Sequence, residues 1–393
     1  MAQGIIGEAV DRIGGQPIAA RMARKAPIRH LDPTLLLTTL LLSAYGAVMI
    51  YSATVADQRA AGLPEDYFLK RQLAFLITGT IVLLITTFFD YRFLRAFAPV
   101  LYGLTLVGLV LVLTPLGETV QGAQRWINLG AFQAQPSELM KLVLIGTTAT
   151  FMAERGGELS ARDVLLALGL FLGPAVLIFL QPDLGTMMVL TAIVFAMLLV
   201  GGARLQHFLV LGGLALVVLA VSLQTGLIRD YQVDRLTAFL DPNPDISSEG
   251  YNLVQSKIAI GSGGMRGKGF ADPEGQTQTA LDYVPEQHTD FIFTAVGEQL
   301  GFVGSAALLA LFAFLIWRAL RIATLSRDMF GTLLASGIAA LWAFHIFVNV
   351  GMTIGIMPIT GIPLPFISYG GSSLITNYFA IGLLLNIHMR RFV

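Results

Sequence analysis

Long, uninterrupted apolar segments recur along the whole chain and are its clearest pattern. A helix needs about 20 mostly apolar residues to cross the hydrocarbon core of a bilayer. The alternation of apolar and polar residues in ten-residue units, which marks a membrane β-barrel, is missing from the sequence. We therefore predict an all-α polytopic membrane protein with about ten transmembrane helices. The predicted spans are 34–54, 73–89, 96–114, 138–153, 164–181, 184–201, 207–225, 291–317, 329–355 and 372–389.

Basic residues gather in the short connections on one side of these predicted helices. Because Lys and Arg are enriched in cytoplasmic loops, they predict that both termini lie in the cytoplasm. The polar residues 1–30 are predicted to be a cytoplasmic tail, followed by one membrane domain over residues 31–393. The residues that give this orientation are Arg21, Arg24, Lys25, Arg29, Arg92, Arg95, Arg155, Arg162, Arg204, Arg318, Arg321, Arg327, Arg390 and Arg391.

One connection is much longer than the others and falls on the opposite, extracytoplasmic side. Residues 226–290 form a predicted loop between the seventh and eighth spans, with ten acidic side chains against five basic ones. Long loops inside compact proteins usually carry function, so we expect the chemistry here. Its glycine-rich stretch, residues 261–269, departs from the P-loop pattern at Ser262 and Gly269. These glycines either let the backbone approach a phosphate or form a flexible loop.

Composition narrows the class of protein further. Of the 393 residues, 55% are hydrophobic and 13% are charged, whereas a soluble domain carries about 25% charged residues. Lys plus Arg and Asp plus Glu are both 25, so the net charge is zero and does not suggest a nucleic acid as a partner. The sequence has no cysteine, which excludes disulfides, thiolate metal sites and a cysteine nucleophile.

Three titratable groups lie within five residues where the long loop enters the eighth span. They are Glu286, His288 and Asp290. A partly desolvated carboxylate at the membrane edge is suited to act as a general base. The alternative is that Asp290 is an acid favoured near a helix N-terminus by the helix macrodipole. Spacing alone does not say which of the three would be the base.

Several polar side chains fall inside or at the ends of the apolar segments. Glu138 and Lys141 lie three residues apart, so they share a helix face and can pair. Ionisable groups at membrane depth usually face a cavity or a partner, although a purely structural ion pair is an equal alternative. Glu298 is predicted to face the bundle interior. His345 and Asn349 are predicted to make interhelical hydrogen bonds rather than bind a metal.

The connection between the last two spans, residues 357–373, contains three prolines among apolar residues. Proline interrupts helical hydrogen bonding, so a regular helix is excluded there. The connection is either a re-entrant segment that only packs or a wall of a groove that faces lipid. Its end, residues 370–373, is predicted to cap the last helix and to present amide N–H groups to an anion.

Five motifs in this chain resemble those of the SEDS family of bacterial shape, division and sporulation proteins, to which RodA, FtsW and SpoVE belong. A single motif would be weak, but all five occur in the family's order and the ten-span topology covers nearly the whole chain. The sequence of residues 360–365 is most similar to that of RodA. The motifs are residues 124–130, 135–138 with Lys141, 181–186, 285–292 and 368–373.

The resemblance implies a peptidoglycan glycosyltransferase that polymerises lipid II at the outer face of the bacterial cytoplasmic membrane, for cell-wall elongation and rod shape. The 4-hydroxyl of an incoming GlcNAc would attack the MurNAc anomeric carbon, with inversion and loss of undecaprenyl pyrophosphate. It also implies a class B penicillin-binding protein, a transpeptidase, as partner, together with the elongation machinery. No tightly bound cofactor is implied, although a divalent cation, Mg²⁺ or Mn²⁺, could bridge pyrophosphate and carboxylate.

By correspondence with the family, Asp290 is the catalytic base. The resemblance places Glu138 and Lys141 in or against the central cavity. Lys257, Arg266 and Lys268 are candidate pyrophosphate contacts because of their charge and their position in the long loop. The other residues expected to bind substrate or line the cavity are Arg125, Trp126, Asp183, Glu286, His288, Ser368 and Ser372.

Three alternatives remain open at this point. The chain could be a division- or sporulation-type polymerase of the same family, because the catalytic motifs do not separate these roles. It could be a lipid II flippase, since transporters also show many helices, intramembrane charges and Pro-interrupted segments. Against transport, no internal repeat is visible and the acidic loop lies on one face alone. A scaffold without catalytic activity would leave the loop chemistry unexplained.

Overall fold

All ten predicted spans are helices in the structure, a computed structural model that describes residues 30–120, 123–128, 130, 133–224, 249–271, 277–279, 281 and 283–392. Most helix ends lie within a few residues of their predicted positions, because continuous apolar runs are clear signals. The predicted tail, residues 1–30, lies almost wholly outside the described residues. The ten helices are α3 (Pro33–Ala60), α4 (Tyr67–Phe88), α5 (Arg92–Val112), α6 (Pro136–Ala153), α7 (Ala161–Leu180), α8 (Leu184–Val200), α9 (Leu205–Gln224), α12 (Ile292–Thr324), α13 (Met329–Ile354) and α14 (Gly371–Arg390).

Six helices among the described residues are long and apolar enough to cross a bilayer, namely α3, α4, α5, α7, α12 and α13. Of the others, α8 has 17 residues, and α6 has 18 residues with Glu138 and Lys141 near its start. The chain is therefore a polytopic helical membrane protein, as predicted. The number of crossings and the side of each loop remain predictions.

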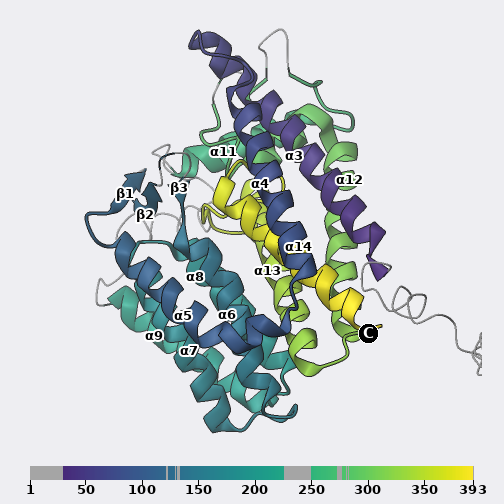
Figure 1. Ribbon diagram of the computed structural model, residues 1–393. Helices are drawn as coiled ribbons and strands as arrows, with labels where there is room; N and C mark the ends of the chain where they lie inside the picture. The colour runs from purple at the N-terminus through teal and green to yellow at the C-terminus, as the bar shows by residue number, and fades with distance from the viewer. Residues whose placement is uncertain are drawn as a thin grey trace, which may run out of the picture.

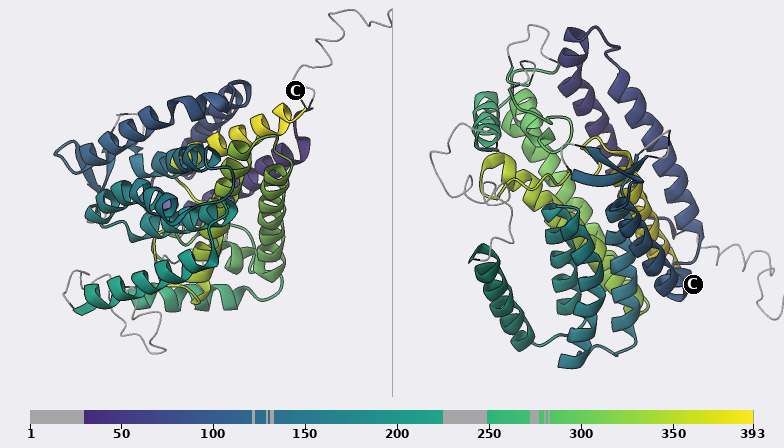
Figure 2. Two further views of the ribbon diagram at one scale, coloured as in Figure 1. Left: turned by 90° about the horizontal axis from the view of Figure 1, so that it is seen from below. Right: turned by 90° about the vertical axis from the view of Figure 1, so that its left-hand side faces the viewer.

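Helix α13 joins two groups of helices (Figure 1). On one side, α3 packs against α4 and α12, and α14 packs along α4. On the other side, α5, α6, α7 and α8 pack against one another, and α9 lies at the edge of the bundle (Figure 2). Helix α13 contacts α12 in the first group and both α6 and α8 in the second. Most of its residues are consequently buried.

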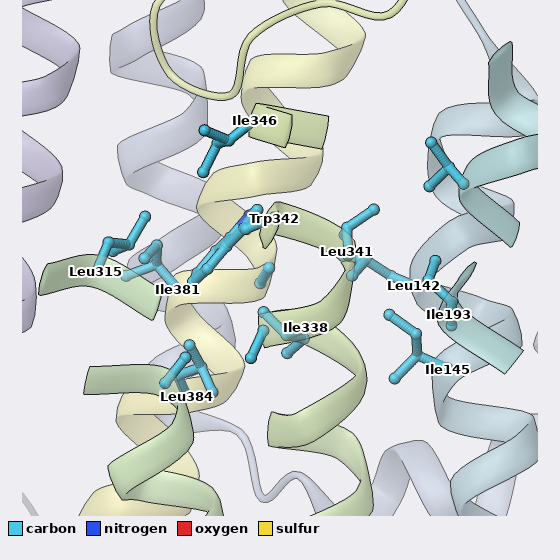
Figure 3. Close-up of a cluster of buried hydrophobic side chains, with 14 of the residues drawn as sticks. Leu142, Ile145, Ile193, Leu315, Ile338, Leu341, Trp342, Ile346, Ile381 and Leu384 are labelled. Carbon is cyan, nitrogen blue, oxygen red and sulfur yellow. The ribbon is translucent and has the colours of Figure 1, made fainter. Parts of the chain in front are cut away.

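The core around α13 is formed by interdigitating apolar side chains, with Trp342 near its centre (Figure 3). Lipid tails are as apolar as these side chains, so close packing holds the helices together. The contact between α4 and α14 illustrates this. A Cβ atom added at Gly382 of α14 would lie 2.9 Å from the carbonyl oxygen of Leu83, so any larger residue would force the two helices apart.

A small antiparallel sheet, absent from our prediction, lies between α5 and α6. Its strands, in the order β1-β2-β3, are β1 (Gly117–Val120), β2 (Ala123–Asn128) and β3 (Gln133–Ala134). The sheet contacts the ends of α5, α6 and α14. It stands at the end of the bundle to which the connection between α13 and α14 also belongs (Figure 1). The all-α prediction is therefore correct for the bundle and wrong for this segment.

The long connection before α12 also contains regular structure that we did not predict. Helix α11 (Glu249–Gly263) packs against α12 and α13. Residues 225–248 of the predicted loop lie outside the described residues. The predicted loop over 226–290 therefore contains a helix, which we did not predict because its mixed polar sequence has no continuous apolar run.

The glycine-rich stretch, residues 261–269, begins in the last turn of α11 and packs against a kink in α12. At Gly301 the backbone leaves the helical conformation, with φ of 65° and ψ of −160°. The N–H groups of Phe302 and Val303 donate instead to the carbonyls of Gly264 and Met265, at 2.9 and 3.2 Å. The glycines thus let two backbones approach each other.

Candidate functional site

A cavity of about 550 Å³ lies at the end of the bundle that carries the sheet. It is lined from β2, from the N-terminal ends of α6, α8 and α14, from the segment before α12, and from α4 and α13. Eight of the thirteen residues predicted for the site line it: Arg125, Trp126, Glu138, Lys141, Asp183, Glu286, His288 and Asp290. Segments far apart in the sequence therefore converge on one site.

Asp290 sits in a tight turn immediately before α12. Glu286 starts the turn with φ of 53°, and its carbonyl accepts hydrogen bonds from the N–H groups of Thr289 and Phe291, at 3.1 and 3.2 Å. The Thr289 hydroxyl donates to the Glu286 carboxylate at 2.8 Å. The turn therefore fixes the direction in which Asp290 leaves the backbone, and its half-buried side chain lines the cavity.

Three successive carbonyl groups of this turn are held by neighbouring segments. The carbonyl of His288 accepts from the Tyr369 N–H at 2.9 Å, and that of Thr289 accepts from the Ser368 hydroxyl at 2.6 Å. The carbonyl of Asp290 accepts from the Asn349 side-chain amide at 2.8 Å. Reactive groups must be held closely in the productive geometry, and these bonds give Asp290 such a support.

Gly361 forms the part of the Pro-rich connection that faces Asp290. A Cβ atom at this position would lie 3.1 Å from the Asp290 Oδ2 atom, and the backbone φ is +68°. Both the conformation and the space therefore favour glycine. Asn349 also donates to the Ile362 carbonyl at 2.8 Å, so one side chain joins this connection to the turn that carries Asp290.

Glu138, Lys141 and His345 form a buried polar chain in the cavity wall. The Lys141 ammonium lies 2.6 Å from the Glu138 carboxylate and 3.3 Å from His345 Nε2. His345 Nδ1 lies 3.2 Å from the Pro363 carbonyl, which can only accept, so Nδ1 carries a proton and Nε2 accepts from Lys141. The predicted pair is thus present, and His345 makes the expected interhelical bond, whereas Asn349 bonds to loop carbonyls.

Arg125 of β2 is bound to the turn between α7 and α8. Its guanidinium donates to the carbonyls of Gln181, at 3.2 Å, and Pro182, and it lies 3.8 Å from the Asp183 carboxylate. Asp183 in turn caps α8, accepting from the N–H and hydroxyl of Thr186. Arg125 therefore fixes the sheet over the bundle, and its charge is partly offset by Asp183.

An aromatic cluster closes one side of the cavity. The rings of Phe68 and His288 lie 4.7 Å apart, and Tyr369 lies edge-on to Phe68 at 5.2 Å. Burial raises the pKa of the Tyr369 phenol, while the neighbouring Arg71 guanidinium acts in the opposite direction. The phenol therefore stays neutral, and Arg71 contributes an exposed cation to the cavity edge.

Ser368 and Ser372 do not line the cavity, but both support its walls. Ser368 bonds to the Thr289 carbonyl and to the Leu364 N–H. The Ser372 hydroxyl donates to the Gln133 carbonyl and accepts from the Gln135 N–H, at 2.9 and 3.1 Å. Helix α14 begins at Gly371 without a side-chain cap, and Gly370 and Gly371 line the cavity. The predicted helix start is confirmed, while side-chain capping is not found.

The three loop cations, Lys257, Arg266 and Lys268, do not line the cavity. The Lys268 ammonium pairs with the fully buried carboxylate of Glu298 at 2.9 Å. Lys257 lies on α11 with its side chain against Gly355, and Arg266 is exposed in the glycine-rich turn. The structure therefore does not bring them to the site where we expected them. Glu298 does face the interior, as predicted.

A divalent cation finds no preformed cage in the part of the chain that the structure describes, where no group of three or more His, Asp or Glu side chains comes together. Glu286 and Asp290 both line the cavity and could bind a cation jointly with a substrate oxyanion. The expectation of Mg²⁺ or Mn²⁺ therefore remains a prediction.

Arg71 and Tyr369 are cavity residues that the sequence reasoning did not select. In the sequence, Arg71 is one of two neighbouring basic residues before an apolar span. Tyr369 is one residue of the motif at the end of the Pro-rich connection. Only the packing of α4 against the start of α14 brings them together. The available signal was this pair of cations directly before a predicted span, on the same side as the long loop.

Comparison with known proteins assigns this arrangement to a family. Residues 33–392 match the FtsW/RodA/SpoVE family, described as cell cycle protein, and the chain belongs to it. Stage V sporulation protein E of Bacillus subtilis is 38% identical over 91% of this chain and 96% of its own length. A probable peptidoglycan glycosyltransferase FtsW of Trichlorobacter lovleyi is 40% identical over 92% and 93%, and the peptidoglycan glycosyltransferase MrdB of Escherichia coli K12 is 38% identical over 92% and 94%.

Solved structures agree with this membership. The chain is similar to one chain of a peptidoglycan synthase complex that coordinates polymerization and crosslinking, with a TM-score of 0.77, 34% identity and coverage of 92% and 98%. The rod shape determining protein RodA of Thermus thermophilus gives a TM-score of 0.68 and 31% identity, with the same coverage. Family membership and apolar helices together identify a multi-pass protein of the inner membrane.

Proposed function

We propose that this chain is a peptidoglycan glycosyltransferase that polymerises lipid II into glycan strands. One observation carries the proposal: a carboxylate fixed by its own turn, Asp290, lines the same cavity as the cations Arg71, Arg125 and Lys141. Glycosyl transfer from a pyrophosphate needs both a base for the attacking hydroxyl and positive groups for the leaving group. Relatives of nearly the same length carry the name peptidoglycan glycosyltransferase.

In the proposed reaction, Asp290 takes the proton from the 4-hydroxyl of the incoming GlcNAc. The freed oxygen attacks the anomeric carbon of MurNAc at the end of the growing strand. The bond between that carbon and the pyrophosphate oxygen breaks, so the α-linkage becomes β. Undecaprenyl pyrophosphate leaves as an anion and needs no proton, so a single base is sufficient.

We assign the pyrophosphate to Arg71 and the N-terminal end of α14. Lys141 is paired with Glu138, and Arg125 lies beside Asp183, so their charges are already partly neutralised. Gly370 and Gly371 line the cavity at the start of a 20-residue helix, where free N–H groups and the macrodipole favour an anion. Lys257, Arg266 and Lys268 stay outside this assignment because they do not line the cavity.

We further propose that the active site faces the extracytoplasmic side and that the protein acts in cell elongation with a class B penicillin-binding protein. The orientation rests on the basic loops at the opposite end of the bundle. The partner rests on the similarity to a chain of a synthase complex that couples polymerization and crosslinking. The chain is 38% identical to the sporulation relative, 40% to the FtsW relative and 38% to the MrdB relative. These similar values do not separate elongation from division or sporulation.

The activity is tested with the purified protein and its cognate transpeptidase in vesicles containing labelled lipid II, by following glycan length and transbilayer lipid II in the same sample. The proposal predicts long glycan strands. Transbilayer movement of lipid II without any polymer would contradict it and support a flippase.

The cellular role is tested by expression in strains depleted of either the elongation or the division polymerase. The proposal predicts that rod shape is restored in the first strain and that filamentation persists in the second. Restored division without restored rod shape would contradict the elongation role.

A further inference from the structure

A second polar cavity lies between the C-terminal parts of α12 and α14. Both helices end near the chain terminus, at the end of the bundle opposite the sheet (Figure 1). Its volume is about 90 Å³. A water molecule occupies about 30 Å³ in the liquid, so this cavity can hold a small group of several heavy atoms. It is lined by Arg318, Arg321, Ile322, Leu325, His388 and Arg391.

Among the described residues, the basic groups at this cavity outnumber the acidic groups paired with them. Arg318 is paired with Asp32, the residue that caps α3. Neither Arg321 nor Arg391 forms an ion pair with any residue that the structure describes. Burial, together with the like charges of Arg318 and Arg321, lowers the pKa of Arg391. An anion placed between these groups would relieve that repulsion.

Buried nitrogen atoms of the residues that line this cavity are left without hydrogen-bond partners. The donors Arg318 Nε and Arg391 Nε have none within the described ranges, and neither has the ring nitrogen His388 Nδ1. Basic residues often lie at helix C-termini because the macrodipole favours them and because their long side chains reach water. That explanation does not account for buried Nε atoms, since a buried charged donor without an acceptor is costly.

The residues around the cavity are of the types that are common at a bilayer interface. The guanidinium groups of Arg318 and Arg321 lie 5.6 and 5.3 Å from the Trp317 ring centroid. Trp317, Leu320 and Leu325 are exposed by 46, 47 and 44%. Tryptophan is enriched at the level of the lipid headgroups, and exposed leucines beside the arginines can contact acyl chains.

We propose that this cavity binds the phosphate of an anionic phospholipid headgroup from the leaflet that faces the basic loops. A phosphate diester offers oxygen acceptors to the guanidinium groups that line the cavity, and arginine binds phosphate in a planar, paired geometry. Basic pockets between helices on the cytoplasmic side are suited to such headgroups. The site is separate from the cavity of Asp290, so it goes beyond the proposed polymerase activity.

The test compares lipid retention by native mass spectrometry of the full chain in detergent, with phosphatidylglycerol and phosphatidylethanolamine as probes. Arg321 and Arg391 are changed together to glutamine, while Arg318 keeps its bond to Asp32. We expect phosphatidylglycerol to bind about tenfold or more weakly to this double variant. Exposed Arg327 provides the control, and Arg327→Gln should bind like the wild type. Equal retention by all three proteins would overturn the proposal.

Two further arms use the wild-type protein alone. Inorganic phosphate, titrated as a competitor, should not displace bound phosphatidylglycerol, because the acyl chains contribute to binding. If inorganic phosphate displaces the bound phosphatidylglycerol, the cavity is a site for soluble anions and the assignment to lipid is overturned. If the double variant does not fold, the wild-type protein is cross-linked to phosphatidylglycerol that carries a photoreactive headgroup. We expect cross-links to residues 317–325 and 388–392. Cross-links confined to other segments would overturn the proposal.

Discussion

At the scale of single residues, buried polar groups are paired in the wall of the cavity that Asp290 lines. Glu138 and Lys141 are both almost fully buried, with side chains 5 and 2% exposed. Removing one partner of such a pair leaves an uncompensated charge in a low-dielectric setting. The pair therefore contributes to the structure as well as to the shape and charge of the cavity.

Lys141→Met should destabilise the protein by about 3–5 kcal/mol and abolish polymerisation, because the Glu138 carboxylate is left without its cation. Thermal unfolding and glycan synthesis measure the two effects. The double variant Glu138→Gln, Lys141→Met should regain stability without regaining activity if the ammonium acts in the cavity. Full recovery of both properties would show that the pair is purely structural.

Gly361→Ala tests the space beside Asp290. The new Cβ would lie 3.1 Å from Asp290 Oδ2, so the carboxylate must move by a few tenths of an ångström. A misplacement of about 1 Å can lower a rate about a hundredfold, so we expect a loss of activity of up to about tenfold. Gly62 is the matched control, since its φ is also +68° and a Cβ there would contact nothing within 4 Å. Both variants should lose about 1–2 kcal/mol of stability, but only Gly361→Ala should lose activity. Equal activity in both would contradict this role of Gly361.

At the scale of elements, the Pro-rich connection between α13 and α14 supports the turn before α12. Ser368, Tyr369 and Asn349 each hold one carbonyl of that turn. The two elements should therefore move together, and weakening their junction should affect catalysis more than substrate binding.

Ser368→Ala leaves the Thr289 carbonyl and the Leu364 N–H without their partner. We expect a loss of about 1–3 kcal/mol in stability and slower polymerisation with unchanged lipid II affinity. Ser262→Ala is the comparison, because that hydroxyl also donates to a backbone carbonyl, Ala259, away from the cavity. The measurement is kcat against KM for both variants, and a pure rise in KM for Ser368→Ala would argue against a positioning role.

The elements that sequence predicted are those with a strong local signal. Continuous apolar runs give helices such as α8 and α13 to within one residue at each end. The strands β1 to β3 are two to six residues long and contain Gly, Gln and Asn, so no alternating pattern marks them. Motif resemblance selected Asp290 and Lys141 correctly as cavity residues. Lys257, Arg266 and Lys268 were expected at the site because they lie in the same loop as Asp290. That expectation was wrong, because the fold of the loop decides where each side chain lies.

At the scale of the whole molecule, the two ends of the bundle differ in chemistry. One end carries the cavity with Asp290, and the other carries most of the short basic connections. The orientation in the membrane follows from this asymmetry through the enrichment of Lys and Arg in cytoplasmic loops.

The absence of cysteine from the sequence allows a direct test of this orientation. Leu63 lies in the connection between α3 and α4, and Glu158 lies in the connection between α6 and α7; both are exposed. In intact spheroplasts, an impermeant maleimide should label Leu63→Cys, and should label Glu158→Cys only after the membrane is permeabilised. The reverse pattern would place the candidate active site in the cytoplasm, where the proposed reaction does not belong.

The central claim is that Asp290 acts as the base that activates the GlcNAc hydroxyl. The most direct measurement is polymerisation of lipid II by the Asp290→Asn variant, beside lipid II binding by the same preparation. Asparagine keeps the shape of the side chain and loses the proton acceptor, and a general base contributes about a hundredfold or more to the rate. We predict that polymerisation falls by at least this factor while binding is retained. Polymerisation at the wild-type rate would contradict the account and transfer the role to Glu286 or His288.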